Sequence, residues 1–286
     1  MDTRHNITHT YINRKAIMMI ILHAMRLCVT IFLVPSSSSR FTSKIRHLEL
    51  VCKSLSSDEK EFASSSEYDD SEAESQFGTK EYWESTYNGL GDFPMEEYSW
   101  YYGFETMKPM ITRYLPLPLK QMKTSSHLTD TISSSIGTIK VLVPGVGNDR
   151  TLLDLFHFGY KDLTAFDYCE SAIERQQDLL MYNREAQEKV KLLVRDARSL
   201  DEDWTDLYDV IIEKGALDAV YLSGKGNVEK AISEFARVIK PGGYVMSISG
   251  VLPEQLRNNA FCQDNWEWIR DGGSDLKAGC FVFRRK

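Results

Sequence analysis

The sequence predicts an α/β fold, in which helices cover both faces of a mostly parallel, twisted sheet. Two observations lead to this prediction. Short apolar runs of the length of buried strands recur between residues 139 and 248, and segments with apolar residues at helical spacing separate them. Strand and helix that alternate in this way form parallel sheets, because the crossover between two parallel strands has room for a helix. The 286 residues, of which 42% are hydrophobic, are enough to bury such a core.

The predicted elements follow one another along the chain. Five apolar runs are expected to be strands, at residues 139–143, 163–166, 190–194, 208–212 and 244–248. Helices are expected over residues 149–158, 171–183 and 228–239. Ser171 is a candidate cap for the second helix. The apolar run at residues 280–283 is expected to be a further, antiparallel strand at or near an edge. The predicted architecture is therefore Rossmann-like.

The first 76 residues differ in composition from the rest. Residues 1–50 are basic, and their apolar run at 16–34 resembles a signal or organelle-targeting segment. A transmembrane helix is one alternative, because a bilayer needs roughly 20 residues. Arg26 lies inside the run and weakens that alternative, because an arginine near the centre of a membrane helix costs roughly 2.5–3.5 kcal/mol on insertion scales. An unstructured leader or a misassigned start is the other. Residues 51–76 are acidic and serine-rich and read as a disordered linker, which leaves a folded domain at residues 77–286.

Charge and cysteine content exclude some classes of function. The net charge of -7 argues against a general nucleic-acid binder, so no nucleic-acid partner is expected. The five cysteines are widely spaced and form no metal-ligand pattern with histidine. They argue against a disulfide framework and against a zinc site, and no metal is expected. A reducing compartment fits this cysteine pattern best.

The end of the first predicted strand carries a glycine turn. In open α/β sheets ligands bind beyond the carboxyl ends of the strands. Gly145 and Gly147 follow the first strand, and the absence of Cβ atoms lets the backbone approach a ligand closely. The helix that follows offers free amides to a carboxylate or phosphate. A purely structural turn is the alternative.

The next three predicted strands end on polar residues. Asp167 lies twenty positions beyond the second glycine, where a carboxylate can accept both hydroxyls of a ribose. Its alternative role is to cap a helix. Asp196 and Ala197 follow the third strand, where an adenine edge would lie. Glu213 and Lys214 follow the fourth. Four such strand ends in series indicate a nucleoside ligand.

The motifs also narrow the kind of nucleoside. The phosphate loop of nucleoside triphosphatases is absent from the sequence. A dinucleotide motif would need glycine where Arg150 stands. S-adenosylmethionine carries a ribose, an adenine and an amino-acid carboxylate but no pyrophosphate, so the pattern favours methyl transfer. A nicotinamide-linked oxidoreductase and a non-catalytic cofactor-binding module are the alternatives from other classes.

Several motifs resemble one enzyme family. The run VLVPGVGN at residues 141–148 resembles the first motif, VLxLGCGN, of class I S-adenosylmethionine-dependent methyltransferases. The run EKGALDA at 213–219 is similar to a motif of the methyltransferase-like 13 and elongation factor 1A lysine methyltransferase group. The segment YWE…Y at 82–87, the run YSWY at 98–101 and the closing run GCFVF at 279–283 also resemble that group. Pro144, Val146 and Ala216 depart from it, standing where leucine, cysteine and threonine are usual.

The resemblance spans residues 77–286 and implies the class I methyltransferase fold, with S-adenosylmethionine as cofactor. The cofactor-binding residues that it implies are Trp83, Tyr87, Tyr98, Gly145, Gly147, Asp167, Tyr168, Asp196, Ala197 and Lys214. The three aromatic residues at 83, 87 and 98 would wall the pocket. Gly145 would lie beside the methionine part, the residues at 167 and 168 beside the ribose, and those at 196 and 197 beside the adenine. Without the resemblance, the spacing of Trp83 and Tyr87 indicates a helix face packed on the core.

The resemblance further implies a protein lysine as methyl acceptor, with elongation factor 1A as the candidate partner. A small-molecule acceptor within the same class is the alternative. A lysine amine must lose its proton before it attacks, since its ordinary pKa is about 10.4. Glu213 is the candidate catalytic residue that orients the amine or accepts the proton, and the alternative is that it only contacts backbone or cofactor. The domain is expected in the cytoplasm, or in an organelle if residues 1–50 are a targeting peptide. Contact with a membrane is expected only if the apolar run is retained. The sequence does not indicate the oligomeric state.

Overall fold

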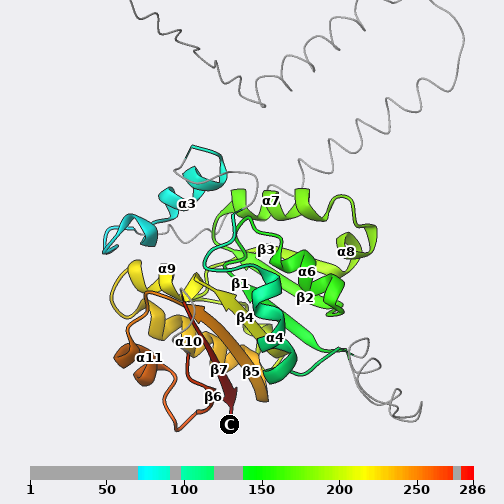
Figure 1. Ribbon diagram of the computed structural model, residues 1–286. Helices are drawn as coiled ribbons and strands as arrows, with labels where there is room; N and C mark the ends of the chain where they lie inside the picture. The colour runs from blue at the N-terminus through cyan, green and yellow to red at the C-terminus, as the bar shows by residue number, and fades with distance from the viewer. Residues whose placement is uncertain (1–69, 91–97, 119–137, 273–277) are drawn as a thin grey trace, which may run out of the picture. The chain divides into compact units, whose positions relative to one another are not determined.

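One mixed sheet organises the part of the chain that the computed structural model describes, which is residues 70–90, 98–118, 138–272 and 278–286 (Figure 1). Its strand order is β3-β2-β1-β4-β5-β7-β6. The strands are β1 (Lys140–Pro144), β2 (Asp162–Asp167), β3 (Val190–Val194), β4 (Tyr208–Lys214), β5 (Ile239–Ser249), β6 (Trp266–Arg270) and β7 (Gly279–Arg285). The first five pair in parallel, whereas β7 pairs antiparallel with both β5 and β6. The predicted fold class is confirmed.

The register brings the strand ends together. Pro144 pairs with Phe166, and Phe166 pairs with Leu193, so the ends of β1, β2 and β3 lie side by side. The strand β4 pairs with β1 on its other side, and strand order therefore reverses between β1 and β4. Parallel strands leave a crevice at such a switch point. The five predicted parallel strands are all present, and β6, which the sequence analysis did not predict, is the outer strand beyond β7.

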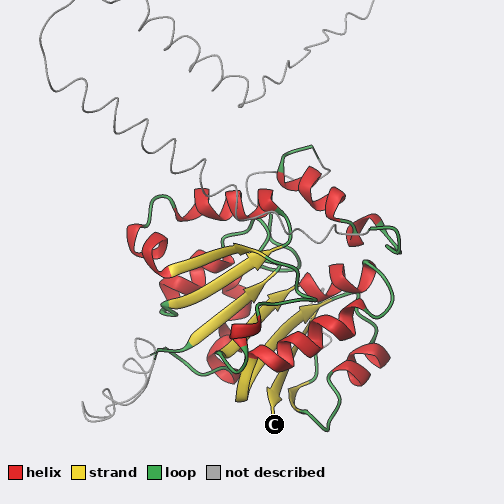
Figure 2. Cartoon of the chain, turned by 180° about the vertical axis from the view of Figure 1, so that it is seen from behind, coloured by secondary structure: helices red, strands yellow, loops and turns green. Residues whose placement is uncertain are grey.

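Helices lie on both faces of the sheet (Figures 1 and 2). The structure describes α3 (Lys80–Tyr87), α4 (Phe104–Tyr114), α6 (Thr151–Phe158), α7 (Glu170–Leu180), α8 (Arg184–Lys189), α9 (Ala216–Leu222), α10 (Asn227–Val238) and α11 (Glu254–Ala260). Two short 3-10 turns are also present: η2 (Gln76–Gly78) precedes α3, and η3 (Glu202–Trp204) lies between β3 and β4. The helices α6, α7 and α10 are the three that the apolar spacing predicts.

Side chains that alternate along the strands divide the core into two clusters, one on each face of the sheet. On one face Val141 and Val143 of β1 pack with apolar residues of α4, α6 and α7. On the other face Leu142 packs with residues of α9 and α10, among them Leu217 and Phe235. The sheet is therefore buried on both sides, as the near-continuous apolar runs of a parallel sheet require.

The start of α7 differs from the prediction. Ser171 does not cap this helix: Cys169 occupies the N-cap position and makes no side-chain capping bond. Glu84 of α3 does the capping instead, because its carboxylate accepts hydrogen bonds from the amides of Glu170 (2.8 Å) and Ser171 (3.3 Å). The hydroxyl of Ser171 also donates to Glu84. A carboxylate at a helix N-terminus satisfies free amides and complements the helix dipole, so this contact fixes α3 to α7.

The described chain begins on the domain surface at Asp70. Residues 70–76, which the sequence analysis assigns to the linker, contact the domain: the amide of Glu74 donates to the carbonyl of Leu222 at 2.9 Å. Gly78 packs so closely on the same turn that a Cβ would lie 2.1 Å from the Leu222 carbonyl oxygen. The predicted leader and most of the predicted linker lie outside the described residues. Within those residues, no helix is both long and apolar enough to cross a bilayer.

Candidate active site

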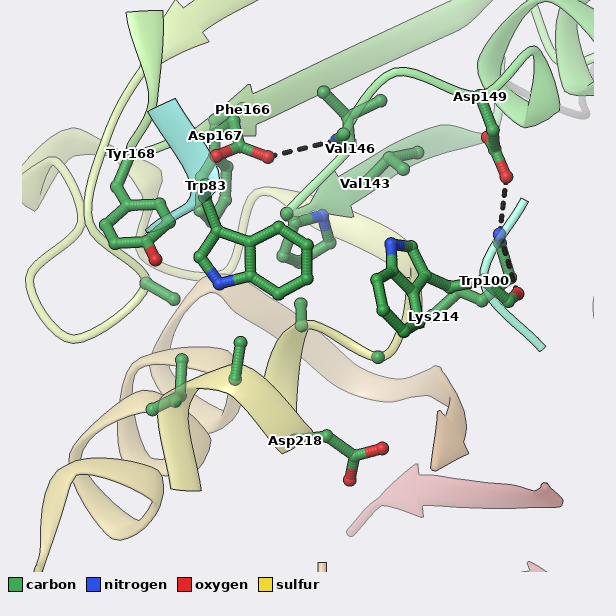
Figure 3. A pocket seen from close by; sticks show the side chains of 18 of the residues that line it. Trp83, Trp100, Val143, Val146, Asp149, Phe166, Asp167, Tyr168, Lys214 and Asp218 are labelled. Atoms are coloured by element: carbon green, nitrogen blue, oxygen red, sulfur yellow. Dashed lines mark hydrogen bonds and ion pairs between the residues drawn. The ribbon is translucent and has the colours of Figure 1, made fainter. Parts of the chain in front are cut away.

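A cavity of about 310 Å³ opens at the carboxyl ends of the parallel strands (Figure 3). Its walls come from the ends of β1, β2, β3 and β4, from the first turns of α9, and from the aromatic segment, by which we mean Phe77–Tyr87 and Tyr98–Tyr101. Cavities of this size are typical of small-molecule sites. Ten of the predicted site residues line it: Trp83, Tyr87, Tyr98, Gly145, Gly147, Asp167, Tyr168, Asp196, Ala197 and Lys214. The structure thus brings together residues that lie up to 131 positions apart in the sequence, from Trp83 to Lys214.

The glycine turn after β1 is shaped by close neighbours. Gly145 and Gly147 have φ of 56° and 59°, a region in which side chains are disfavoured. A Cβ on Gly145 would lie 2.5 Å from the Cβ of Ala216 at the start of α9. A Cβ on Gly147 would lie 3.1 Å from the hydroxyl oxygen of Tyr87. Both glycines are therefore needed for the turn to pack between α9 and the aromatic segment.

Asp167 stands at the end of β2 and faces this turn. One carboxylate oxygen accepts a hydrogen bond from the Gly147 amide and the other accepts one from the Cys169 amide, both at 3.0 Å. Burial raises the pKa of Asp167 to about 6, against the lowering effect of backbone hydrogen bonds. A carboxylate has about four lone-pair sites, so these bonds leave room for two further donors. That capacity is what the two hydroxyls of a ribose require.

Aromatic rings form the opposite wall. Trp83 stacks on Tyr87 with ring centroids 5.9 Å apart, and the edge of Trp100 meets Trp83 at 5.4 Å. Tyr98 meets Trp100 edge-on at 5.2 Å. The indole nitrogen of Trp83 donates to the carbonyl of Phe77 at 2.8 Å, which fixes the plane of its ring. Trp83 and Tyr87 are thus buried on the domain, as helical spacing predicts, and also line the cavity.

Lys214 at the end of β4 joins the aromatic segment to the glycine turn. Its ammonium pairs with the carboxylate of Asp149, and donates to the hydroxyl of Ser99 at 3.1 Å and to the carbonyl of Trp100 at 3.0 Å. These three partners use all three N–H donors of the ammonium. Sequence reasoning missed Asp149, although an acid two positions after the second glycine of the turn was the available signal. The cavity therefore contains a neutralised ion pair.

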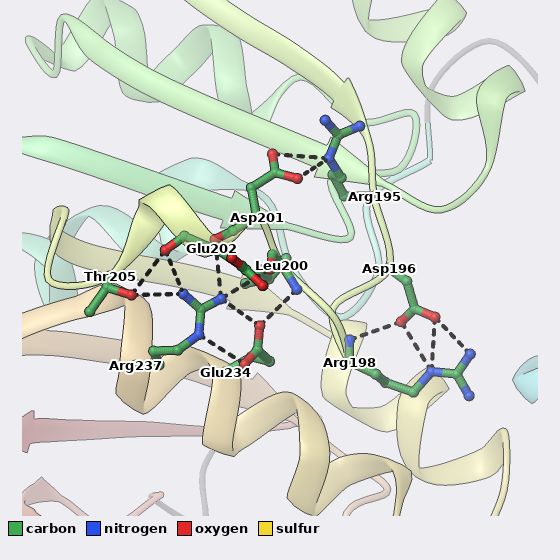
Figure 4. A network of polar contacts seen from close by, with 9 residues as sticks. All are labelled: Arg195, Asp196, Arg198, Leu200, Asp201, Glu202, Thr205, Glu234 and Arg237. Atoms are coloured by element: carbon green, nitrogen blue, oxygen red, sulfur yellow. Dashed lines mark hydrogen bonds and ion pairs between the residues drawn. The ribbon is translucent and has the colours of Figure 1, made fainter. Parts of the chain in front are cut away.

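Asp196 follows β3 and pairs with a neighbour. Arg198 donates to both of its oxygens, with distances from 2.7 to 3.0 Å (Figure 4). Arg195 pairs with Asp201 in the same loop, at 2.9 Å. Asp196 lines the cavity together with Ala197, so an adenine amine would have to share its carboxylate with Arg198.

Glu213 has a different environment from the other predicted residues. It is fully buried and is not among the described residues that line the cavity. The hydroxyl of Ser247 donates to one of its oxygens, and the amide of Leu217 donates to the other at 3.2 Å. Burial raises the pKa of Glu213 to about 8. Its catalytic role stays a prediction, and its contacts agree with the alternative that it binds backbone at the start of α9.

Tyr101 and Asp218 also line the cavity, although neither is among the predicted site residues. Tyr101 precedes α4 and Asp218 lies in the first turn of α9, and the Tyr101 hydroxyl donates to the Asp218 carboxylate. Both belong to motifs that carried the family resemblance, YSWY and EKGALDA. Their pairing spans 117 positions of sequence, which no local pattern reports.

Comparison with known proteins agrees with this geometry. The sequence profile of a family described as "Methyltransferase domain" matches residues 138–274. The chain is 28% identical to EEF1A lysine methyltransferase 4 of Mus musculus over 139 residues, which cover 45% of the chain and 52% of the relative. It is 26% identical to EEF1A lysine methyltransferase 2 of Danio rerio over 187 residues, or 62% and 70% of the two chains. The chain therefore spans only about half the length of the mouse relative.

A solved structure shares the fold. The crystal structure titled "[4+2]-Cyclase SpnF" superposes with a TM-score of 0.52 at 12% identity, over 75% of this chain and 97% of that one. At this identity the likeness concerns the fold alone.

The fold and the cavity define a class I S-adenosylmethionine-dependent methyltransferase domain. Residues 138–274 match such a methyltransferase domain, and among curated proteins the chain resembles the EEF1A lysine methyltransferases. S-adenosylmethionine is the cofactor, and the residues present fit it. The glycine turn forms a cradle that a Cβ would fill, and Asp167 keeps lone pairs for a ribose. The first motif's departures at Pro144 and Val146 leave both glycines in the left-handed region.

Proposed function

We propose that this chain transfers the methyl group of S-adenosylmethionine to the side-chain amine of a protein lysine, with elongation factor 1A as the candidate acceptor. The observation that carries the proposal is one cavity in which a nucleoside-binding edge faces an aromatic wall. Support for a lysine of elongation factor 1A comes from the names of the relatives. Residues of the aromatic segment and of EKGALDA, the motifs that resemble that group, line the same cavity.

The strand order suggests how the cofactor lies. The ends of β3, β2 and β1 follow one another along the edge of the sheet. Asp196 with Ala197 would face the adenine, and Asp167 with Tyr168 would face the ribose. Gly145 and Gly147 would lie along the methionine part. Trp83, Tyr87 and Tyr98 would cover the nucleoside from the other side. Lys214 would hold the aromatic segment in place through its bonds to Ser99 and Trp100.

Methyl transfer asks little acid–base chemistry of the protein. When bound, the cofactor supplies a reactive sulfonium methyl group. The chain must hold a neutral amine in line with that methyl group, at roughly 3–3.5 Å. The aromatic wall excludes water, and desolvation lowers the pKa of an ammonium, which favours its loss of a proton. Aromatic faces also attract a positive charge. Because Asp149 neutralises Lys214, that lysine does not repel the incoming cation.

The direct test uses the full chain with methyl-labelled S-adenosylmethionine and purified elongation factor 1A. Label is expected on the factor, and mass spectrometry should place it on a lysine. S-adenosylhomocysteine in excess should abolish the label, which controls for non-enzymatic transfer.

Other outcomes redirect or contradict the proposal. Label on another protein of a cell lysate would reject elongation factor 1A as acceptor and keep the enzyme class. Label in a small molecule that chromatography separates from S-adenosylmethionine, with none in protein, would favour the small-molecule alternative. Measurable binding of S-adenosylhomocysteine without label in any fraction would favour a non-catalytic binding module.

A further inference from the structure

The cavity has a second half that the proposed cofactor position leaves open. Along the strand order, the ends of β4 and β5 lie beyond that of β1, on the side away from β2 and β3. Tyr101, Gly215, Asp218 and Val251 line the cavity there. Val251 is 45% exposed, so this half reaches the surface. An acceptor would have to enter here in order to meet the reactive end of the cofactor.

Tyr101 is seated between two glycines at these strand ends. A Cβ on Gly215, after β4, would lie 3.3 Å from the Tyr101 ring. A Cβ on Gly250, after β5, would lie 2.8 Å from the opposite edge of the ring. Glycine at both positions therefore gives the ring a fitted slot. The ring spans the ends of the two strands and forms one side of the open half of the cavity.

The backbone of Tyr101 is strained. Its φ is 63°, in the left-handed region, where a residue other than glycine is disfavoured by roughly 1–2 kcal/mol. Strain of this kind persists only where the surroundings fix the residue, and it concentrates at functional sites. Here the hydroxyl of Tyr101 donates to the Asp218 carboxylate, and the ring occupies the glycine slot. These two contacts hold the strained residue with its ring against the cavity.

Asp218 fixes both sides of this half. Besides the Tyr101 hydroxyl, its carboxylate accepts hydrogen bonds from the Ser249 hydroxyl at 2.6 Å, the Gly250 amide at 2.9 Å and the Leu252 amide at 2.8 Å. These four donors match the roughly four lone-pair sites of a carboxylate. Asp218 therefore has no site left to take a proton from an amine. It positions Tyr101 against the loop that carries Val251.

We propose that Tyr101, anchored by Asp218, is the specificity-determining wall of the acceptor subsite. This inference rests on the proposed function and deepens it. The Tyr101 ring, the Gly215 backbone and the Val251 side chain present mainly apolar surface. Such a surface suits the unbranched methylene chain of an alkylamine, as in lysine, and disfavours a bulky or charged acceptor. Tyr101 acts by shape and Asp218 acts through Tyr101.

The test compares two ligands in titration calorimetry of the full chain. S-adenosylhomocysteine fills the cofactor half alone. An aza analogue of the cofactor with an aminobutyl chain in place of the methyl group also reaches into the acceptor half. Tyr101→Phe removes the hydroxyl that binds Asp218 and keeps the ring. We expect this variant to lower the affinity for the analogue about tenfold, which is the scale of a hydrogen bond to a charged group. The affinity for S-adenosylhomocysteine should change less than twofold.

Tyr102→Phe is the matched control. The buried hydroxyl of Tyr102 has no hydrogen-bond partner among the described residues, and Tyr102 does not line the cavity. This variant should bind both ligands as the wild type does. Tyr101→Ala tests shape directly: it should improve the affinity for an analogue with a bulky aminomethylbenzyl chain relative to the aminobutyl one. Circular dichroism checks that each variant folds.

Each result decides the inference. Equal weakening of both ligands by Tyr101→Phe would place Tyr101 in the cofactor site and overturn the proposal. Unchanged affinity for the aminobutyl analogue, or an unchanged preference between the two analogues in Tyr101→Ala, would place the acceptor wall elsewhere. These measurements need no protein acceptor. Failure to label elongation factor 1A would therefore contradict the proposed function while the ligand titrations still judge Tyr101.

Discussion

Glu213 offers the sharpest test of the chemistry, because its two possible roles respond differently to one change. The residue is fully buried, and burial raises the pKa of its carboxyl to about 8 from an ordinary value of 4.5. In the protonated form its O–H would face Ser247, whose hydroxyl can also accept, while the other oxygen keeps the Leu217 amide. Glutamine has the shape and the hydrogen-bonding pattern of that protonated form. Glu213→Gln should therefore fold.

The size of the effect follows from proton linkage. Between pH 4.5 and about 8 the folded chain keeps the Glu213 proton that the unfolded chain has lost. The free energy of unfolding must then fall as pH rises through this window. One pKa unit corresponds to about 1.36 kcal/mol, so the full difference is of order 5 kcal/mol. Glu213→Gln has no such proton to lose, so its free energy of unfolding should not fall in this way. Its stability relative to the wild type should therefore be greatest near pH 9 and smallest near pH 5.

Urea unfolding at pH 5, 7 and 9 measures this difference. Glu229→Gln is the control, because Glu229 is an exposed glutamate of α10. Identical pH dependence of the wild type and Glu213→Gln would falsify the linkage reasoning. Methyl transfer by the same variant separates the two roles. A catalytic base should lose at least about a hundredfold in kcat, the usual contribution of general base catalysis, whereas a residue that supports α9 should keep near-normal kcat.

Three further predictions concern the cofactor half of the cavity. Asp167→Ala should lower the affinity for S-adenosylhomocysteine at least about tenfold in calorimetry, since it removes hydrogen bonds to a charged group. Unchanged affinity would mean that the pocket is misplaced. Gly145→Ala should lower the free energy of unfolding by about 2–5 kcal/mol in urea, because a left-handed backbone and the 2.5 Å approach to Ala216 both disfavour a Cβ, and an unaltered midpoint would refute this. Lys214→Met leaves the buried Asp149 unpaired and should be destabilising by about 3–5 kcal/mol, with partial recovery in the double variant Lys214→Met/Asp149→Asn; no recovery would show that the ion pair is not the cause.

The sheet could be predicted from sequence because its signals are local. The run at residues 190–194 became β3 with the same bounds, and β1, β2 and β4 begin or end within two residues of their predicted limits. Each strand is short, apolar and closed by a glycine or polar turn. The strand β6 was not predicted. Its sequence, WEWIR, alternates apolar and polar residues over only five positions, and its burial depends on pairing with β7.

The site could be predicted only in part, for a reason of distance along the chain. Residues just beyond each strand end, such as Asp167 and Gly145, are found from the strand pattern, because parallel strands place their ends on one edge. Contacts between the aromatic segment and the sheet have no such rule. Ser171 shows this, since its local pattern predicts a cap, whereas Glu84, 87 positions away, occupies that place. Tyr101 and Asp218 are likewise far apart in the sequence, by 117 positions, and no local pattern predicts their contact.

The environments of the buried carboxyls explain why similar residues at one sheet edge have different roles. A carboxylate offers about four lone-pair sites, so the number of donors around it tells how much capacity remains. Asp167 accepts two amides and keeps room for a ribose. Asp218 accepts four donors and can only position other groups. Asp149 is tied to Lys214, and Glu213, whose pKa is about 8, lies mostly protonated at neutral pH. The partners of each carboxyl group, rather than its residue type, therefore separate ligand binding, positioning and support of the fold. Asp167→Ala should fail in the binding of S-adenosylhomocysteine, Tyr101→Phe in the binding of the aminobutyl analogue, and Lys214→Met in urea unfolding.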